Sequence, residues 1–128
     1  MDVRDDERLS RFLLFSRWFS RVQNRVKPDA YIPHPRVELS VSCTEALAES
    51  EVWPLGQAVV DSRSDNVTLY GRGDVRASVV RVQKLQIIRD DQPLRHANIV
   101  GWPIDSKESQ RMLALEIAAA SSLVIHEI

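Results

Sequence analysis

The residues best suited to chemistry lie in one short stretch of the second half of the chain. Asp90, Asp91, His96 and Asn98 fall within nine residues of one another. A carboxylate beside an imidazole is the minimum arrangement for acid–base catalysis or for holding a divalent cation. A metal would also need a third convergent ligand, so the sequence predicts neither a metal site nor a cofactor.

The same stretch also fits a structural role. The two aspartates of Asp90-Asp91-Gln92-Pro93 can cap a turn, and His96 can pack against Trp102. This interpretation is favoured because no spacing here is diagnostic of a catalytic site. If the stretch does bind a ligand, the candidate residues are Asp90, Asp91, Arg95, His96, Asn98 and Trp102.

A second candidate is the basic N-terminal third. Residues 8–36 carry seven basic side chains and one acidic one, although the whole chain has a net charge of -1. Arginines alternate there with Phe12, Phe15, Trp18 and Phe19, a pairing used by proteins that bind single-stranded nucleic acid. The simpler interpretation, which is favoured, places the aromatics in the core and the arginines in solvent. The candidate nucleic-acid-binding residues are Arg11, Arg17, Arg21, Arg25 and Lys27.

Other chemical motifs are weak or absent. Cys43 is the single cysteine, so it forms no internal disulfide and is expected to be a small buried hydrophobe. Arg72-Gly73-Asp74 is expected to form a turn entering a strand. The neighbouring glycines lack the spacing and the lysine of a phosphate-binding loop.

The secondary structure that positions these residues is ambiguous in the first segment of the chain. Residues 9–22 fit either an amphipathic helix or a short strand followed by irregular chain, and four bulky residues at 12–15 favour the strand. Pro28, Pro33 and Pro35 forbid a helix over 27–36. Further strands are predicted over 37–42, 67–70, 75–82, 85–89, 97–100 and 123–125.

Two helices are predicted. Ser50 can cap the first, with Pro54 at about its first turn. Asp105 and Glu108 form an acidic capping box for the second, which spans about Ser106 to Ala120 and is apolar enough to be the central buried helix. The chain is therefore predicted to be a single small α+β domain over 1–128. It has a mixed or antiparallel sheet, about two helices and a flexible extension at 1–8.

Composition places the protein in the cytoplasm. The lone cysteine fits a reducing compartment, the charged N-terminus is unlike a secretory signal, and no apolar stretch is long enough for a bilayer. No membrane partner is therefore expected.

The segment Arg95–Pro103, together with residues 39–41 and 52–56, resembles a family of small bacterial proteins that share an RHANIVGWP-like sequence and have no assigned activity. The resemblance spans about residues 11–120. It implies a bacterial origin and a complete single-domain protein, makes the segment from His96 to Pro103 a plausible shared site, and transfers no catalytic residue.

Three functional hypotheses follow. The favoured one is a non-catalytic binding module that uses the basic N-terminal third to contact nucleic acid or an acidic protein. The second is a small enzyme with acid–base or metal chemistry around Asp90, Asp91 and His96. The third is a structural homo-oligomer.

Overall fold

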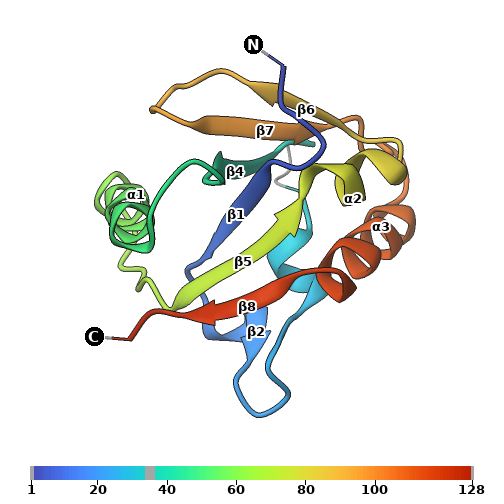
Figure 1. The fold of residues 1–128 in the computed structure, drawn as a ribbon. Coiled ribbons are helices and arrows are strands. Elements are labelled where there is room, and N and C mark those ends of the chain that lie inside the picture. Colours follow the sequence, from blue (N-terminus) through green and yellow to red (C-terminus); the bar gives the residue numbers. More distant parts are fainter. Residues whose placement is uncertain (1, 34–36, 128) are drawn as a thin grey trace.

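A computed structural model describes residues 2–33 and 37–127; His34, Pro35 and Arg36 lie outside the described residues. The protein is an α+β domain, as predicted, and its main sheet is the antiparallel one of the two predicted alternatives, with six strands (Figure 1). The order across the sheet is β6-β7-β4-β1-β5-β8. The strands are β1 (Arg8–Leu13), β4 (Leu39–Cys43), β5 (Gly71–Arg76), β6 (Gln86–Arg89), β7 (His96–Val100) and β8 (Ser122–Ile125).

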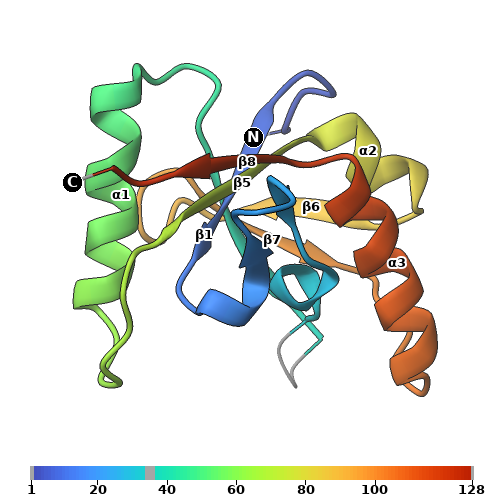
Figure 2. The same ribbon diagram turned by 90° about the horizontal axis from the view of Figure 1, so that it is seen from below.

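Helices cover both faces of the sheet. Figure 2 shows α1 (Glu49–Asp61) on one side of the molecule and α3 (Lys107–Ala119) on the other, next to the short α2 (Ala77–Val82). Gly56 of α1 lies against the ring of Phe12, because a Cβ there would come within 2.7 Å of that ring. The sheet therefore has an α1 face and an α3 face.

The ambiguous segment is a strand, as favoured. β1 pairs with β5 over six positions, from Arg8↔Arg76 to Leu13↔Gly71. An arm then leads away from the sheet through a 3₁₀ turn (Ser16–Trp18), the two-stranded hairpin of β2 (Phe19–Ser20) and β3 (Arg25–Val26), and a second 3₁₀ turn (Pro28–Tyr31). This second turn is the only helical structure in the described part of the proline-rich stretch.

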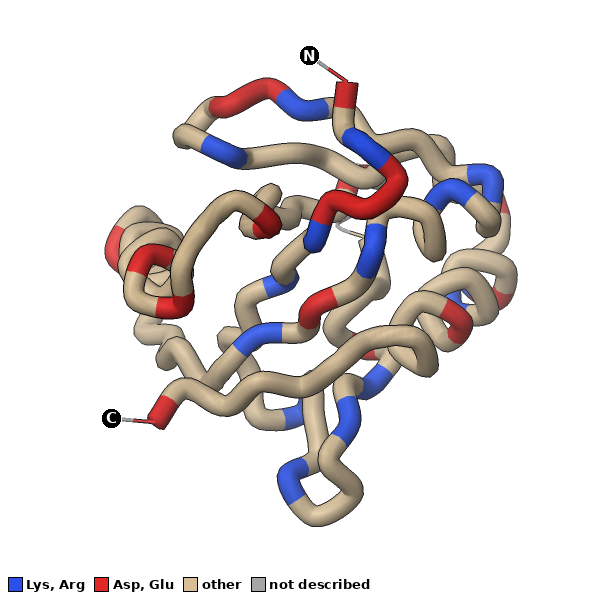
Figure 3. The backbone as a smooth tube through the Cα atoms, in the orientation of Figure 1, with Lys and Arg blue, Asp and Glu red and all other residues tan. Residues whose placement is uncertain are grey.

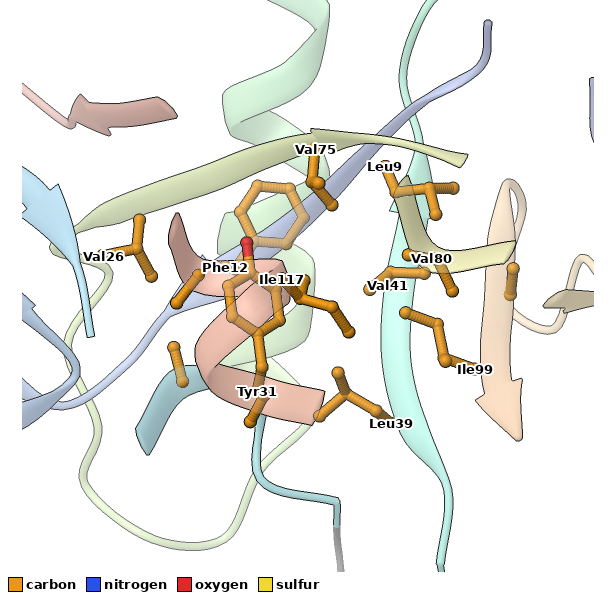
Figure 4. Packing of buried hydrophobic residues seen from close by; sticks show 14 of the residues in the cluster. Leu9, Phe12, Val26, Tyr31, Leu39, Val41, Val75, Val80, Ile99 and Ile117 are labelled. Carbon is orange, nitrogen blue, oxygen red and sulfur yellow. The ribbon is translucent and has the colours of Figure 1, made fainter. Parts of the chain in front are cut away.

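The arm closes the core on the α3 face. Tyr31 is fully buried, and its hydroxyl accepts a 2.8 Å hydrogen bond from Ser121 Oγ. Figure 4 shows Tyr31 and Ile117 pointing into the same space as Leu39, so the arm, α3 and the sheet share one core. Burial raises the pKa of Tyr31 well above its usual range.

Two predicted strands are wrong. Residues 67–70 form no strand. Pairing begins only at Gly71, and β5 then runs through residues 72–74, the stretch expected to form a turn. Residues 77–82 form α2 although they are rich in valine. The N–H groups of Ala77 and Ser78 donate to the carbonyls of Glu7 and Asp5. The N-terminal segment therefore supplies acceptors for N–H groups that have no partner within the first turn of this helix. Tertiary contact here outweighs β propensity.

The predicted helix starts are also corrected. Helix α1 begins at Glu49, before Ser50, and Pro54 lies inside it; the side chain of Glu51 accepts from the N–H of Ala48 at 2.8 Å. Helix α3 is capped by Ser106 in place of Asp105, because Ser106 Oγ accepts a 3.0 Å hydrogen bond from the N–H of Ser109.

Helix α3 is not the central buried helix that its apolar composition predicts. Met112 and Leu115 are exposed by 62% and 50%, and only one stripe of the helix packs inward. That stripe is Ala114, Ile117 and Ala118.

The N-terminal segment, for which the sequence predicts a flexible extension, makes defined contacts. Val3 is buried, and its carbonyl accepts a hydrogen bond from Arg81. The carboxylate of Glu7 accepts from the N–H of Glu45 at 2.8 Å. These contacts join the segment to α2 and to the loop after β4.

Candidate functional site

The turn between β6 and β7 is organised around Asp90. Its Oδ1 lies 2.7 Å from His96 Nδ1 and accepts the N–H of Gln92 at 3.0 Å, while Oδ2 lies 3.4 Å from Asn98 Nδ2. The hydrogen bond with His96, followed by the one from the N–H of Gln92, lowers the pKa of Asp90. Asp90 is therefore an ionised acceptor that fixes the histidine ring, so the structure brings Asp90, His96 and Asn98 together.

The other predicted residues of this stretch lie elsewhere. Asp91 Oδ1 accepts from Arg89 Nε and from the N–H of Arg95, both at 2.9 Å, so Asp91 caps the turn instead of facing His96. The hydrogen bond from Arg89 is the main reason that the pKa of Asp91 is lowered. Trp102 is buried and donates to the carbonyl of Ile99 at 2.9 Å, which makes it a core residue.

A row of polar residues crosses the α1 face of the sheet in register. Ser42 is directly opposite His96 on one side and Ser10 on the other, and Ser10 is opposite Asp74. Ser10 Oγ donates to Asp74 Oδ1 at 2.7 Å, whereas the side chain of Ser42 makes no hydrogen bond to any described residue. Residues directly opposite each other in a sheet have Cβ atoms about 5 Å apart. The row of Asp90, His96, Ser42, Ser10 and Asp74 therefore brings distant parts of the sequence together.

A pocket opens where β1 and β4 separate. The two strands pair only at Leu9↔Cys43 and Ser10↔Ser42, and beyond this point they diverge around a hollow of about 370 Å³. We call this hollow the fork pocket. Its walls come from β1, β4, α1 and the arm, and include Ser10, Arg11, Phe12, Phe15, Trp18, Ser40, Ser42, Arg63 and His96.

Arginines and aromatic rings alternate around the fork pocket. The guanidinium carbon of Arg11 lies 4.8 Å from the ring centre of Trp18. Those of Arg17 and Arg63 lie 4.5 Å and 5.7 Å from the ring centre of Phe15. Phe15 also borders an adjoining hollow lined by Arg17, so its ring is shared by both. Cations above aromatic faces are held by the ring quadrupole.

Arg11 is the unusual cation of the group. It donates to the carbonyl of Ala30 at 2.8 Å and to that of Ser40 at 3.1 Å, and no carboxylate of the described residues pairs with it. Burial, helped by the positive charge of Arg63 and opposed by Tyr31, lowers the pKa of Arg11 to about 10. The side chain is therefore still charged at neutral pH, but poorly solvated.

The remaining predicted basic residues lie on the arm. Figure 3 shows Lys and Arg gathered along the β2–β3 hairpin, which contains no Asp or Glu. Arg21 forms an exposed 3.4 Å ion pair with Glu127, and Arg25 donates to Gln23 at 2.6 Å. In the part of the chain that the structure describes, Arg17, Arg25 and Lys27 have no carboxylate partner. We call Arg17, Arg21, Arg25 and Lys27 the basic arm.

Sequence reasoning missed three residues of the pocket. Arg63 lies in a polar loop and donates two hydrogen bonds to the carboxylate of Asp65, at 2.8 and 2.7 Å. Nothing in the sequence of this loop indicates that Arg63 borders a pocket. Ser42 and Ser10 look like the solvent side of strands. The alternation of arginine with Phe15 and Trp18 is the sequence feature that points to this region. Trp18 is buried, as the favoured interpretation predicts, and it also borders the pocket.

Other candidate chemistries receive no geometric support in the described residues. Across residues 2–33 and 37–127, no three His, Cys, Asp or Glu side chains converge as a metal site. Cys43 is buried, as predicted. Within the same residues no helix combines the length and apolarity that crossing a membrane requires.

Comparisons of the chain with protein-family models, with curated proteins and with solved structures gave no match.

Proposed function

We propose that this protein is a binding module for single-stranded nucleic acid. In this proposal a nucleotide occupies the fork pocket, and the basic arm contacts the neighbouring phosphates. The sequence predicts a binding surface anywhere in the basic N-terminal third. The proposal assigns binding to two places, the fork pocket and the basic arm. An acidic protein remains the alternative partner, to be separated by experiment.

The observation that carries the proposal is the state of Arg11. Its guanidinium lies in the pocket wall, is partly desolvated and, among the described residues, donates only to backbone carbonyls. Because a charge in a poorly solvated site interacts strongly with an opposite charge, a bound phosphate would stabilise it more than it would a surface arginine. Arg63 lines the same pocket, and its repulsion of Arg11 would also be relieved by an anion.

The aromatic rings supply the second half of the recognition. Arg17 and Arg63 lie near the ring of Phe15 and Arg11 lies near that of Trp18, and the two rings pack edge-on with their centres 4.9 Å apart. A base would stack on the part of Phe15 that borders the pocket, beside a bound phosphate. Stacking of one base on an aromatic side chain contributes about 1–3 kcal/mol and tolerates any base. Binding with little sequence preference is therefore expected.

The opposing charges near the pocket set a limit on affinity. Arg63 is paired with Asp65, and Glu38 also lines the pocket. With few free cations and a chain charge of -1, we expect a Kd on the order of micromolar or weaker.

Fluorescence anisotropy with labelled single-stranded DNA and RNA, at low and at raised salt, tests the proposal. Changing Arg17, Arg21 and Arg25 together to Ser should weaken binding and lower the slope of log K against log salt by about two, since each lost phosphate contact removes about 0.7. Arg11→Gln should weaken binding with a smaller change in slope. A matched control removes three cations elsewhere, with Arg4, Lys84 and Lys107 changed to Ser.

The outcomes separate the partner classes. If the arm variant and the control variant lose the same affinity for the oligonucleotides, binding depends only on the net charge of the protein, and the proposal is overturned. Absence of oligonucleotide binding at low salt overturns it as well. If poly-glutamate binds under those conditions and the oligonucleotides do not, the partner is an acidic protein.

A further inference from the structure

We infer that the fork pocket cleaves single-stranded RNA, with His96 removing the proton from a ribose 2′-hydroxyl. This inference rests on the proposed binding function, which brings the substrate to the pocket. It assigns a catalytic task to the histidine pair that binding alone does not require.

The histidine is prepared for proton transfer on one side only. Asp90 holds Nδ1 at 2.7 Å, and Nε2 makes no hydrogen bond to any described residue. A carboxylate on Nδ1 favours the tautomer with its proton on that nitrogen, so the lone pair of Nε2 is left to accept a proton. Asp90 is held in turn by the N–H of Gln92 and by Asn98, so the ring orientation is fixed before any ligand binds.

The location of His96 matches this task. Its side chain is 19% exposed and lines the same pocket as Arg11 and Arg63. The hydroxyl of Ser42, directly across the sheet, can donate to a phosphate oxygen beside the imidazole. His96 and Ser42 project from the α1 face of the sheet, and Arg63 reaches the pocket from the loop after α1. Arg11, the residue after Ser10 on β1, leaves the opposite face and lines the pocket from the side of the arm.

The reaction balances without a further reactant. His96 Nε2 takes the proton of the 2′-hydroxyl as O2′ forms a bond to phosphorus. The bond from phosphorus to O5′ then breaks, and O5′ leaves with the proton that His96 returns. The products are a 2′,3′-cyclic phosphate and a 5′-hydroxyl, and Arg63 stabilises the extra negative charge on phosphorus as it develops. Water, metal and oxidant are not consumed.

RNA is the expected substrate because the nucleophile comes from the ribose. DNA lacks the 2′-hydroxyl, so it should bind in the fork pocket and remain intact. The same argument makes an RNA with 2′-O-methyl groups a ligand that cannot react.

The experiment therefore separates cleavage from binding. A labelled single-stranded RNA, its all-deoxy equivalent and its 2′-O-methyl equivalent are incubated with the protein in the presence of EDTA. We expect cleavage of the RNA alone, with the 2′,3′-cyclic phosphate identified by mass spectrometry. Anisotropy should report binding of all three strands.

Variants assign the roles. His96→Gln should lower the cleavage rate at least a hundredfold, and any loss of binding to the 2′-O-methyl strand should be far smaller than that. Asp90→Asn should lower kcat about ten- to a hundredfold with little change in KM, as expected for a positioning residue. The matched controls are His126→Gln and Asp105→Asn, which should cleave like the wild type.

Each outcome decides one question. Binding of the 2′-O-methyl strand without cleavage of the RNA overturns the inference and leaves the proposed function intact. Loss of binding overturns both. Cleavage of the all-deoxy strand, or cleavage that survives in His96→Gln, also overturns the assignment of the ribose hydroxyl and His96.

Discussion

Arg72 Nε lies 3.0 Å from both carboxylate oxygens of Asp74, two residues further along the same strand. The other side of its guanidinium binds Glu49 of α1, and its central carbon lies 4.7 Å from the ring centre of Trp53. A cation that is only 1% exposed therefore joins α1 to the sheet. Its ion pairs with Glu49 and Asp74 keep the pKa of Arg72 raised against the effect of burial, which alone would lower it.

Removing this cation should be costly. In Arg72→Ala the carboxylate of Asp74, whose side chain is 12% exposed, loses its cation in a poorly solvated place. We expect the free energy of unfolding to fall by about 3 kcal/mol or more. Urea unfolding gives the value, and Arg4→Ala is the matched control. Arg4 and Asp6 are 83% and 69% exposed, so that change should stay within about 0.5 kcal/mol. Comparable losses in the two variants would contradict the structural role of Arg72.

The cap of α3 gives a second prediction. Ser106→Ala removes the acceptor of the 3.0 Å hydrogen bond from the N–H of Ser109 and should cost about 1 kcal/mol. Asp105→Ala should change the unfolding free energy by much less, since Asp105 is exposed and does not hold that N–H. A larger loss in Asp105→Ala than in Ser106→Ala would restore the cap that the sequence pattern predicts.

The glycines of β5 give a third prediction. A Cβ on Gly71 would run into the backbone carbonyl of Val124 on β8, whereas one on Gly73 would come 2.7 Å from the hydroxyl of Tyr31 and 3.0 Å from Val26. Both substitutions to Ala should destabilise the protein, on the order of 1–3 kcal/mol. We expect Gly71→Ala to destabilise the protein more than Gly73→Ala. The new Cβ at 71 would meet the backbone of a paired strand, whereas the one at 73 would meet side chains, which can shift more easily. Thermal unfolding ranks the two, and equal melting temperatures would contradict the close approach of β8.

These glycines also explain why β5 could not be predicted from the sequence. Gly71 and Gly73 look like turn residues when only local propensity is considered, but the strand needs them because β8 and Tyr31 occupy the space of a side chain. The residues that crowd them are about fifty positions away in one case and about forty in the other. No local pattern carries that information, so the strand over 71–76 was predicted in the wrong place.

Elements with a local cause were predictable. The alternation around Val41 and the β-branched residues around Ile99 define strands whichever neighbours they have, and the α+β class follows from such strands and the two predicted helices. The pocket depends instead on the register of three strands, β7, β4 and β1, which places Ser42 between His96 and Ser10. The sequence could place Asp90 and His96 in one turn, but not the serines or Arg63 that share their surroundings.

Cys43 gives the last prediction. Burial, helped by the nearby charge of Glu7, raises the pKa of its thiol to about 11. In the unfolded chain the pKa is about 8.5, so between these values the folded protein retains a proton that the unfolded chain has released. The resulting contribution to stability is present below about pH 8.5 and is lost as the pH rises toward 11.

Two measurements check this sign. At pH 8 a thiol reagent such as DTNB should react slowly with the native protein and rapidly after urea is added, because only the unfolded chain exposes a thiolate. Between pH 8 and pH 9.5 the unfolding free energy of the wild type should fall relative to that of Cys43→Ala, in which this group is absent. The difference between the two proteins cancels the titration of Tyr31 and the other groups common to both. A difference that stays constant with pH, or rapid labelling of the native protein, would place Cys43 in contact with solvent and contradict the packing of β1 against β4.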